Sequence, residues 1–386
     1  MLDRRTFLLT SLAAIASTLS GCSNSQNVLD ITLLQGSIPP QLIGDFRKIM
    51  AKQGQIALNP EINLQAILEL LTAWQKPEES SSFIDSVPVV GKNTTERANL
   101  VTLGDYWLHD AIADKLIQPL DTTELEGWDS LPTRWQNLVR RDRDGNLNPE
   151  GDIYGAPYRF GNTLIAYRQD KIAWTPTDWS DLWRKELKDR ISLVDNYREV
   201  IGLTLKKLGY SYNTSDLSQV PNLETELQQL QQQVKLYSSD KYLQPLVLGD
   251  TWLAVGWSTD ILELTKRYSD IGVVVPASGT SLWADVWVQP SQPQEASTDR
   301  VISSLLSTWI NFCWNAKAVK QIALFTNSLS PILTGEDRQN IIQLEKTGIL
   351  QSTIAAFDKS EFLYPQSLST ETAYLKLWKQ IRQVSG

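Results

Sequence analysis

Short apolar runs typical of β-strands alternate along this chain with stretches of helical periodicity. Runs such as 28–36, 191–195 and 271–279 have the length of buried strands, whereas 40–54 and 198–210 repeat apolar residues at helical spacing. Both helical stretches contain a glycine near their ends, where helices commonly stop. This alternation predicts an α/β architecture in which helices cover β-sheets.

The rest of the chain continues the alternation. We find no internal repeat and no linker long enough to separate autonomous domains, so we expect two lobes joined by several chain crossings. The other expected elements are a strand, turn and helix over 100–120, two extended pieces over 152–170, a helix over 178–187 capped by Asp178 or Ser180, a helix with the stripe Leu223, Leu227, Leu230 and Val234, a strand over 252–260, and a mostly helical C-terminal hundred residues.

The first 21 residues have the features of an export signal. Arg4 and Arg5 precede an apolar run over 7–19, which is too short to span a bilayer. The arginine pair is similar to a twin-arginine signal, although the general export route remains an alternative. Residues 19–22 resemble a bacterial lipobox, which implies cleavage before Cys22 and attachment of lipid to its sulfur. The alternative is an uncleaved N-terminal anchor.

Composition excludes several kinds of function. The chain has one histidine, His109, so histidine-rich metal sites and most acid–base catalysis are not expected. The formal net charge of −8 argues against nucleic-acid binding and mildly favours a cationic ligand. Of the two cysteines, Cys22 is the expected lipid site. Cys313 is then a buried thiol, and the core must hold the fold without a disulfide framework. We expect no metal and no cofactor.

Residues 141–152 resemble a calcium-binding loop only in part. Asp142, Asp144 and Asn146 fit its first three ligand positions. Leu147 stands where the loop requires glycine, and Ile153 stands at the position of the final carboxylate. A solvated turn is therefore the better interpretation.

The segment 256–260 begins like the nucleophile elbow of a hydrolase but lacks its second glycine. A serine–histidine–aspartate site would also need His109, which lies in a helix-like stretch. Hydrolase chemistry is therefore not expected.

An acidic residue lies between two tryptophans in the segment 278–290, SGTSLWADVWVQP. Strict alternation places Trp283, Asp285 and Trp287 on the same side of an extended strand. A buried carboxylate is costly without a partner, and 271–299 contain no lysine or arginine. The pattern therefore favours an incoming cation as the partner of Asp285. The alternative is that the indoles fill a core edge while Asp285 reaches solvent or a backbone donor.

A second acidic residue lies at the start of the helix expected from 198. Asn196 as N-cap and Glu199 three residues later form a pattern typical of a capping box. In the alternative interpretation, Glu199 points off the helix start into a cleft, where a carboxylate can bind a cation.

Taken in order, the segments 153–168, 178–216, 253–260 and 273–290 resemble the spermidine/putrescine-binding proteins of bacterial ABC importers. The likeness covers roughly residues 100–310. It implies a two-lobed periplasmic binding protein of the type II class. Each lobe would be a central β-sheet flanked by helices, and the ligand cleft would lie between the lobes. The expected division is a signal peptide over 1–21, lobe 1 over 22–155 plus 276–315, and lobe 2 over 156–275 plus 316–386.

The resemblance also implies the roles of individual residues. Asp285 matches the carboxylate that receives a primary amine, and Trp283 matches an aromatic wall beside it. Glu199 matches the carboxylate for another amine, with Arg198 as its orienting partner. Trp257 matches an aromatic residue that covers the methylene chain.

One further residue is implied, and three places depart from the family pattern. Tyr106 matches a tyrosine that follows a strand of the first lobe. Asn196 stands where the family usually carries aspartate, the loop 35–40 has no aromatic residue, and 325–331 only partly represents a late family segment. One acidic and one aromatic contact are therefore missing. This weakens spermidine in particular and leaves a diamine or another amine-bearing solute open.

The expected function is that of a non-enzymatic, monomeric solute-binding lipoprotein, anchored in the periplasm through Cys22. It would capture a polyamine such as putrescine or spermidine and deliver it to an ABC permease and its ATPase. Two alternatives remain: a type II receptor for iron, thiamine or an organic acid, and a scaffold lipoprotein with a degenerate pocket. The sequence lacks the adjacent tyrosines that an iron receptor of this class typically offers. An anion receptor should have basic residues where this chain has Asp285 and Glu199.

Overall fold

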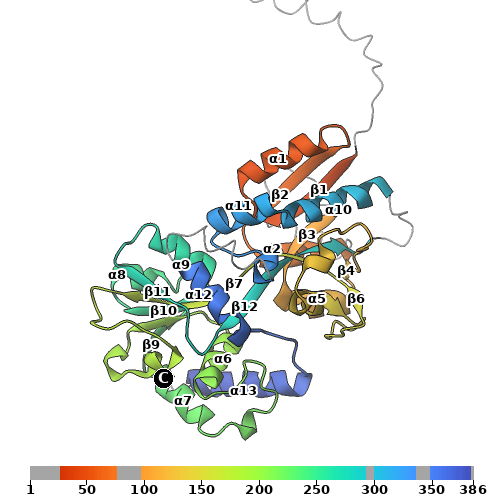
Figure 1. Cartoon of the computed structure of the whole chain (residues 1–386). Helices are drawn as coiled ribbons and strands as arrows, with labels where there is room; N and C mark the ends of the chain where they lie inside the picture. The colour runs from red at the N-terminus through yellow and green to blue at the C-terminus, as the bar shows by residue number, and fades with distance from the viewer. Residues whose placement is uncertain (1–26, 76–96, 293–299, 336–347, 384–386) are drawn as a thin grey trace, which may run out of the picture.

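The computed structural model describes residues 27–75, 97–292, 300–335 and 348–383, and it forms two lobes (Figure 1). The strands are β1 (Val28–Leu34), β2 (Gln55–Glu61), β3 (Leu100–Gly104), β4 (Ile117–Gln118), β5 (Arg140–Arg141), β6 (Asp152–Ile153), β7 (Ala156–Arg168), β8 (Ile191–Leu193), β9 (Val234–Tyr237), β10 (Leu253–Trp257), β11 (Ile271–Val274), β12 (Ser281–Pro290) and β13 (Glu361–Phe362).

Helices surround these strands on both sides. The α-helices are α1 (Pro40–Met50), α2 (Leu64–Gln75), α4 (Leu108–Ala113), α5 (Thr133–Val139), α6 (Tyr197–Lys207), α7 (Leu223–Gln231), α8 (Gln244–Leu248), α9 (Ser258–Thr265), α10 (Arg300–Trp314), α11 (Ala316–Thr326), α12 (Ile349–Ala356) and α13 (Leu368–Gln383). Shorter 3₁₀ turns are η1 (Asp105–Trp107), η2 (Trp128–Ser130), η3 (Trp179–Trp183), η4 (Lys185–Leu187), η5 (Leu217–Gln219), η6 (Pro331–Thr334) and η8 (Phe357–Lys359).

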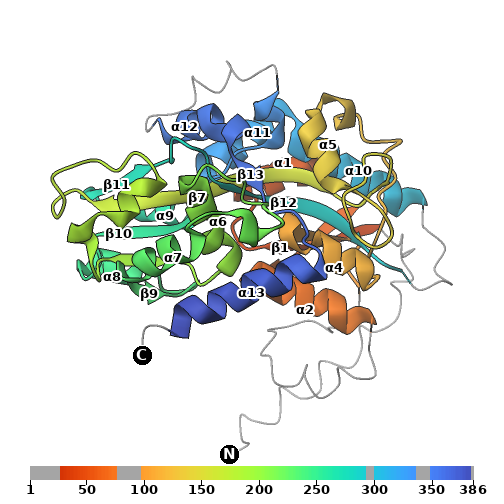
Figure 2. The same cartoon turned by 90° about the horizontal axis from the view of Figure 1, so that it is seen from below.

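Two long strands, β7 and β12, connect the lobes. In the described residues the main sheet runs in the order β2-β1-β3-β12-β7-β10-β8-β9, with β4, β11 and β13 paired off this path. The outer strands are parallel within each lobe, whereas β12 and β7 pair antiparallel with each other and with their outer neighbours. Figure 2 shows both long strands passing through the middle of the molecule with helices on either side. The sheets of the two lobes are thus joined into one path.

Strand β7 is buried along almost its whole length, because both faces of the sheet are covered. Its first half pairs with β12, and its second half pairs with β10 and β11. The sequence predicted two extended pieces over 152–170. The structure instead has one long strand after the two-residue β6, and Gly161 lies inside it.

The hydrophobic cores only partly follow the predicted lobe boundaries. One large cluster contains the buried residues of β1, β3, α10 and α11, and a second contains those of α6, α7 and α13. Buried residues between 318 and 362 pack in the first cluster, although 316–386 were predicted for lobe 2. Tyr374 and Ile381 of α13 do pack in the second. The last crossing between the cores therefore comes after 362 and not at 315/316, while the number of crossings is as predicted.

Most predicted elements are present, and the differences have local causes. The stretch 178–187 forms 3₁₀ turns instead of an α-helix, with Asp178 accepting from the backbone N–H of Trp179 at 2.8 Å. The predicted strand over 252–260 ends at Trp257, where α9 begins. Val234 starts β9 and does not continue α7. The sequence analysis missed β2 and α2.

Three smaller expectations concern single groups. Asp142 accepts from the backbone N–H groups of Asp144 and Asn146 at 3.0 and 2.8 Å, which confirms the solvated turn. Cys313 is a free, buried thiol, as predicted. Cys22 lies outside the described residues.

In the part of the chain with described coordinates, no helix combines the length and the apolar content needed to cross a membrane.

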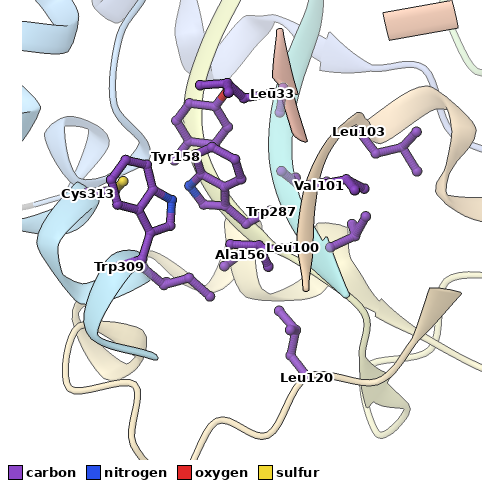
Figure 3. Packing of buried hydrophobic residues seen from close by; sticks show 14 of the residues in the cluster. Leu33, Leu100, Val101, Leu103, Leu120, Ala156, Tyr158, Trp287, Trp309 and Cys313 are labelled. Carbon is purple, nitrogen blue, oxygen red and sulfur yellow. The ribbon is translucent and has the colours of Figure 1, made fainter. Parts of the chain in front are cut away.

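Trp287 belongs to the first hydrophobic core. Its ring stacks on Tyr158 with centroids 4.3 Å apart and meets Trp309 edge-on at 5.6 Å. Figure 3 shows these rings in contact, with the sulfur of Cys313 beside them. All three aromatic residues are fully buried. Trp287 is therefore a structural residue of the core, as the core-filling interpretation of the two indoles predicted for it.

Replacing Trp287 by alanine is expected to lower the free energy of unfolding by about 3–5 kcal/mol, because it leaves a cavity between two aromatic rings. Urea denaturation followed by circular dichroism measures this change. Leu368→Ala is the control, since Leu368 is 81% exposed and should change stability little. Equal stability of the two variants would contradict the packing role of Trp287.

Candidate functional site

The candidate residues gather around the first half of β12, where the two lobes meet. Three side-chain contacts and the pairing of β12 with β7 join residues 281–285 to segments from both lobes. Those segments are the start of α6, the middle of β7, and Asp105 at the carboxyl end of β3, where ligands commonly bind in open α/β sheets. The sequence-predicted residues are therefore brought into one region, although they come from distant parts of the chain.

Asp285 has a cationic partner inside the protein. It lies directly opposite Arg159 in the antiparallel pairing of β12 with β7. The Nε of Arg159 donates to Oδ2 of Asp285 at 2.5 Å, and the two residues are only 5% and 2% exposed. The expectation that the protein supplies no cation to Asp285 is therefore wrong. The partner comes from a strand 126 residues away in sequence, beyond the neighbourhood that the sequence analysis considered.

Trp283 lies half-buried beside this ion pair. The guanidinium carbon of Arg159 lies 5.7 Å from the centre of the indole. The ring also packs against Gly161, where a Cβ atom would come within 2.3 Å of Trp283 Cζ2 and of Ser258 Oγ. Only glycine fits at this point of β7. The indole Nε1 is buried and has no hydrogen-bond partner among the described residues.

Glu199 reaches from α6 to β12. The side chain of Asn196 caps the helix by accepting from the N–H groups of Arg198 and Glu199 at 2.9 and 3.3 Å. The Glu199 carboxylate accepts from the hydroxyl of Ser281 at 2.6 Å and is 5% exposed. Burial raises the pKa of Glu199, and the Ser281 hydrogen bond partly opposes that shift. Asn196 thus serves as the cap, and Glu199 points inward.

Arg198 is held by the C-terminal segment. Its guanidinium donates to the carbonyl of Tyr364 at 3.0 Å and to Oδ1 of Asn213 at 3.1 Å. It also lies 5.6 Å from the ring centre of Tyr374. Burial raises the pKa of Glu199, and the positive charge of Arg198, which the resemblance placed beside it as an orienting partner, partly opposes that shift. Burial lowers the pKa of Arg198, opposed mainly by neighbouring tyrosines.

Tyr106 and Trp257 lie on the exposed side of the same region. Tyr106, 41% exposed in η1, contacts Tyr197 of α6, and burial together with Tyr106 raises the pKa of Tyr197. Elements of both lobes therefore touch here. Trp257 ends β10 opposite Thr163 of β7, half-buried and edge-on to Tyr242 at 6.3 Å.

Arg159 and Asp105 were not predicted from the sequence as site residues. Asp105 directly follows the fully buried β3 and accepts from the backbone N–H of Ala284 at 2.8 Å. Burial raises its pKa to about 7. A carboxylate immediately after a buried strand was a usable signal in the sequence. Arg159 is a basic residue in a largely apolar stretch of the sequence. Its partner, however, can be identified only from the register of β7 against β12.

Ser258 and His109, which a hydrolase site would need, have other hydrogen-bond partners in the described structure. The Ser258 hydroxyl accepts from the N–H of Asn162 at 3.2 Å, while the imidazole of His109 contacts Asp110 at 2.8 Å. Within the described ranges, no three His, Cys, Asp or Glu side chains are arranged to hold a metal ion.

Comparison with known proteins gives a consistent result. A family model described as bacterial extracellular solute-binding protein matches residues 96–347. The spermidine/putrescine-binding periplasmic protein of Salmonella typhimurium is 30% identical over 194 residues, which are 50% of this chain and 53% of that protein. The protein of the same name from Escherichia coli is 28% identical over 226 residues, 58% of this chain and 61% of its own length. The chain thus spans about half the length of these curated relatives.

The fold is also that of a solved binding protein. The crystal structure of the spermidine/putrescine ABC transporter substrate-binding protein PotD from Streptococcus pneumoniae, in complex with calcium and HEPES, superposes with a TM-score of 0.73. The two chains are 21% identical, and the match covers 92% of this chain and 99% of that one. This confirms the predicted two-lobed type II fold.

Asp105 is expected to make stability depend on pH. Burial raises the pKa of Asp105 from 3.8 to about 7 in the folded protein. Between these pH values the folded protein keeps a proton on Asp105 that the unfolded chain has released. Its contribution therefore falls as pH rises from about 4 to 7, by up to about 4 kcal/mol. Asp105→Asn should match wild type at pH 4 and be more stable at pH 8, measured by urea denaturation.

Asp114→Asn is the matched control for this prediction, because Asp114 is exposed on the same lobe. It should leave the difference between pH 4 and pH 8 unchanged. A similar pH dependence in Asp105→Asn and wild type would mean that Asp105 is not protonated near neutral pH in the folded protein.

Proposed function

Because this chain belongs to the family of bacterial extracellular solute-binding proteins, we propose that it is the substrate-binding component of an ABC importer and that its ligand is a small cationic amine. The match is to binding proteins and not to enzymes, in agreement with the sequence analysis. The two curated relatives are spermidine/putrescine-binding proteins by name, which supports an amine of the polyamine class.

The observation that carries the proposal is the buried carboxylate of Glu199. It lies where α6 of one lobe meets β12, and its hydrogen-bond partner is the neutral hydroxyl of Ser281. A desolvated carboxylate is stabilised strongly by a bound cation through charge-assisted hydrogen bonds. Trp283, Trp257 and Tyr106 lie in the same region and supply aromatic surface for methylene groups and for cation–π contacts.

Binding in this region would couple to movement of the lobes. The strands β7 and β12 pass between them, and Tyr106 of one lobe already contacts Tyr197 of the other. A ligand held by Glu199 on one side and by aromatic residues of the other lobe would favour the closed arrangement. Closure would then be the signal for delivery to the permease and its ATPase.

The N-terminal sequence supports anchoring at a membrane surface. Export by a signal over residues 1–21, cleavage before Cys22 and lipid attachment to its sulfur would place the binding lobes in the periplasm. A monomer anchored in this way would meet a permease in the same membrane. Export by the twin-arginine route is the version that the Arg4–Arg5 pair favours.

Amine binding is expected to depend on Glu199. Glu199→Gln should weaken the tightest-binding amine in a panel of putrescine, spermidine and N-acetylputrescine by about 10–100-fold, because a hydrogen bond to a charged group is lost. Isothermal titration calorimetry on the chain without its signal measures this. Asp195→Asn is the control. It removes a negative charge only four residues from Glu199, and the side chain of Asp195 is 45% exposed.

The proposal fails if no amine of the panel binds the folded protein at millimolar concentration. That result would favour a different cargo or a scaffold role. Equal weakening by Glu199→Gln and Asp195→Asn would show a general charge effect instead of a binding site.

Lipidation is expected at Cys22. In a bacterial host, the wild-type chain should be recovered from the membrane fraction, with an N-terminal peptide that begins at a lipid-modified Cys22. The Cys22→Ala variant should lack this lipid-modified peptide, and the Cys313→Ala variant should retain it. Mass spectrometry of the N-terminal peptide distinguishes these cases, and an unmodified Cys22 in the membrane fraction would favour an uncleaved anchor.

A further inference from the structure

Two of the buried carboxylates of the candidate site, Asp285 and Glu199, differ in what neutralises them. Asp285 forms an ion pair with Arg159, whose Nε lies 2.5 Å from its Oδ2. Glu199 accepts from the neutral Ser281 hydroxyl, and no lysine or arginine forms an ion pair with it in the described part of the chain. Arg198, its neighbour in sequence, directs two of its donors to Asn213 and Tyr364. Of these two carboxylates, Glu199 is the one without a salt bridge among the described residues; burial raises its pKa, and the positive charge of Arg198 partly opposes that shift.

An ammonium group at Asp285 would have to share the carboxylate with Arg159 or displace it. Both side chains are almost completely buried, so a displaced guanidinium would lose its counter-ion inside the protein. Leaving one member of a buried ion pair unpaired is strongly unfavourable. The guanidinium also lies near the face of Trp283, the aromatic surface that would otherwise cover a ligand cation. Arg159 thus already provides the positive charge at this end of the site.

The register of the sheet keeps Arg159 in this position. Asp285 and Arg159 are direct neighbours across the antiparallel strands, and the pairing shifts by one residue immediately beyond them. Gly161, two residues along β7, lets the Trp283 ring lie close to the strand. The ion pair is therefore built into the sheet that joins the lobes and does not depend on a surface loop.

From these contacts we propose that Arg159 determines the specificity of the site by replacing one ammonium group of the ligand. The ligand would be a monocationic amine, with its ammonium at Glu199 and an uncharged, oxygen-bearing end toward Arg159. This inference rests on the proposed function. A guanidinium has five N–H donors and no acceptor, so the group it favours is a hydrogen-bond acceptor such as an amide carbonyl.

Two ligands of equal chain length test the charge count. Putrescine carries an ammonium at both ends of four methylene groups, whereas N-acetylputrescine replaces one ammonium by an amide. The wild-type chain without its signal is expected to bind N-acetylputrescine at least about tenfold more tightly than putrescine in calorimetry. Arg159→Met should reverse this order, because Asp285 is then free to receive the second ammonium.

Two further variants control for folding and for charge. Arg159→Met with Asp285→Asn removes both charges, so it should fold and keep the wild-type preference for N-acetylputrescine. Arg184→Met removes an arginine whose side chain is 44% exposed, and it should leave both affinities unchanged. Circular dichroism reports whether each variant is folded. If Arg159→Met does not fold, the wild type and the double variant still decide the proposal.

The outcomes separate this inference from the proposed function. Wild-type protein that binds putrescine as tightly as N-acetylputrescine would overturn the role of Arg159 and leave an amine receptor in place. A double variant that gains affinity for putrescine would also overturn it. If neither ligand nor spermidine binds any folded variant, the proposed function itself fails, and this inference fails with it.

Discussion

The antiparallel pairing of β7 with β12 is the interaction on which the fold and the candidate site both depend. These strands are the only continuous connection of the sheet between the two outer groups of parallel strands in the described residues. The same pairing fixes the neighbours of Trp283 and Asp285 across the sheet. A shift of one residue would turn these side chains to the opposite face. Register therefore decides which groups meet at the junction of the lobes.

Burial of charge is the second constraint on this region. Asp105, Glu199 and Asp285 are all less than 10% exposed and lie around residues 281–285 of β12. Each is stabilised differently, by a backbone N–H, by a hydroxyl and by Arg159. An unneutralised buried carboxylate is costly, so these differences separate structural groups from a group that gains most from a ligand. This difference is the reason for proposing Glu199 as the carboxylate that binds the ligand cation.

Sequence reasoning was accurate where the physical cause is local. Asn196 caps α6 as its spacing predicted, and Cys313 is a buried thiol as its apolar surroundings predicted. It failed where a contact joins distant segments. The absence of basic residues near Asp285 in the sequence suggested a missing cation, yet Arg159 pairs with it from another strand. It also could not tell that buried residues after 316 pack in the first core.

By itself the sequence determined the α/β architecture, the order of most strands and helices, and several of the candidate residues that the fold brings together. Periodicity, caps and turns are properties of neighbouring residues, so they can be read along the chain. Only the tertiary structure decided how those residues are neutralised and packed. Strand register assigned Trp287 to the core and Arg159 to Asp285, and the approach of α6 to β12 placed Glu199 against the hydroxyl of Ser281. Such pairings depend on long-range packing, which no local pattern encodes.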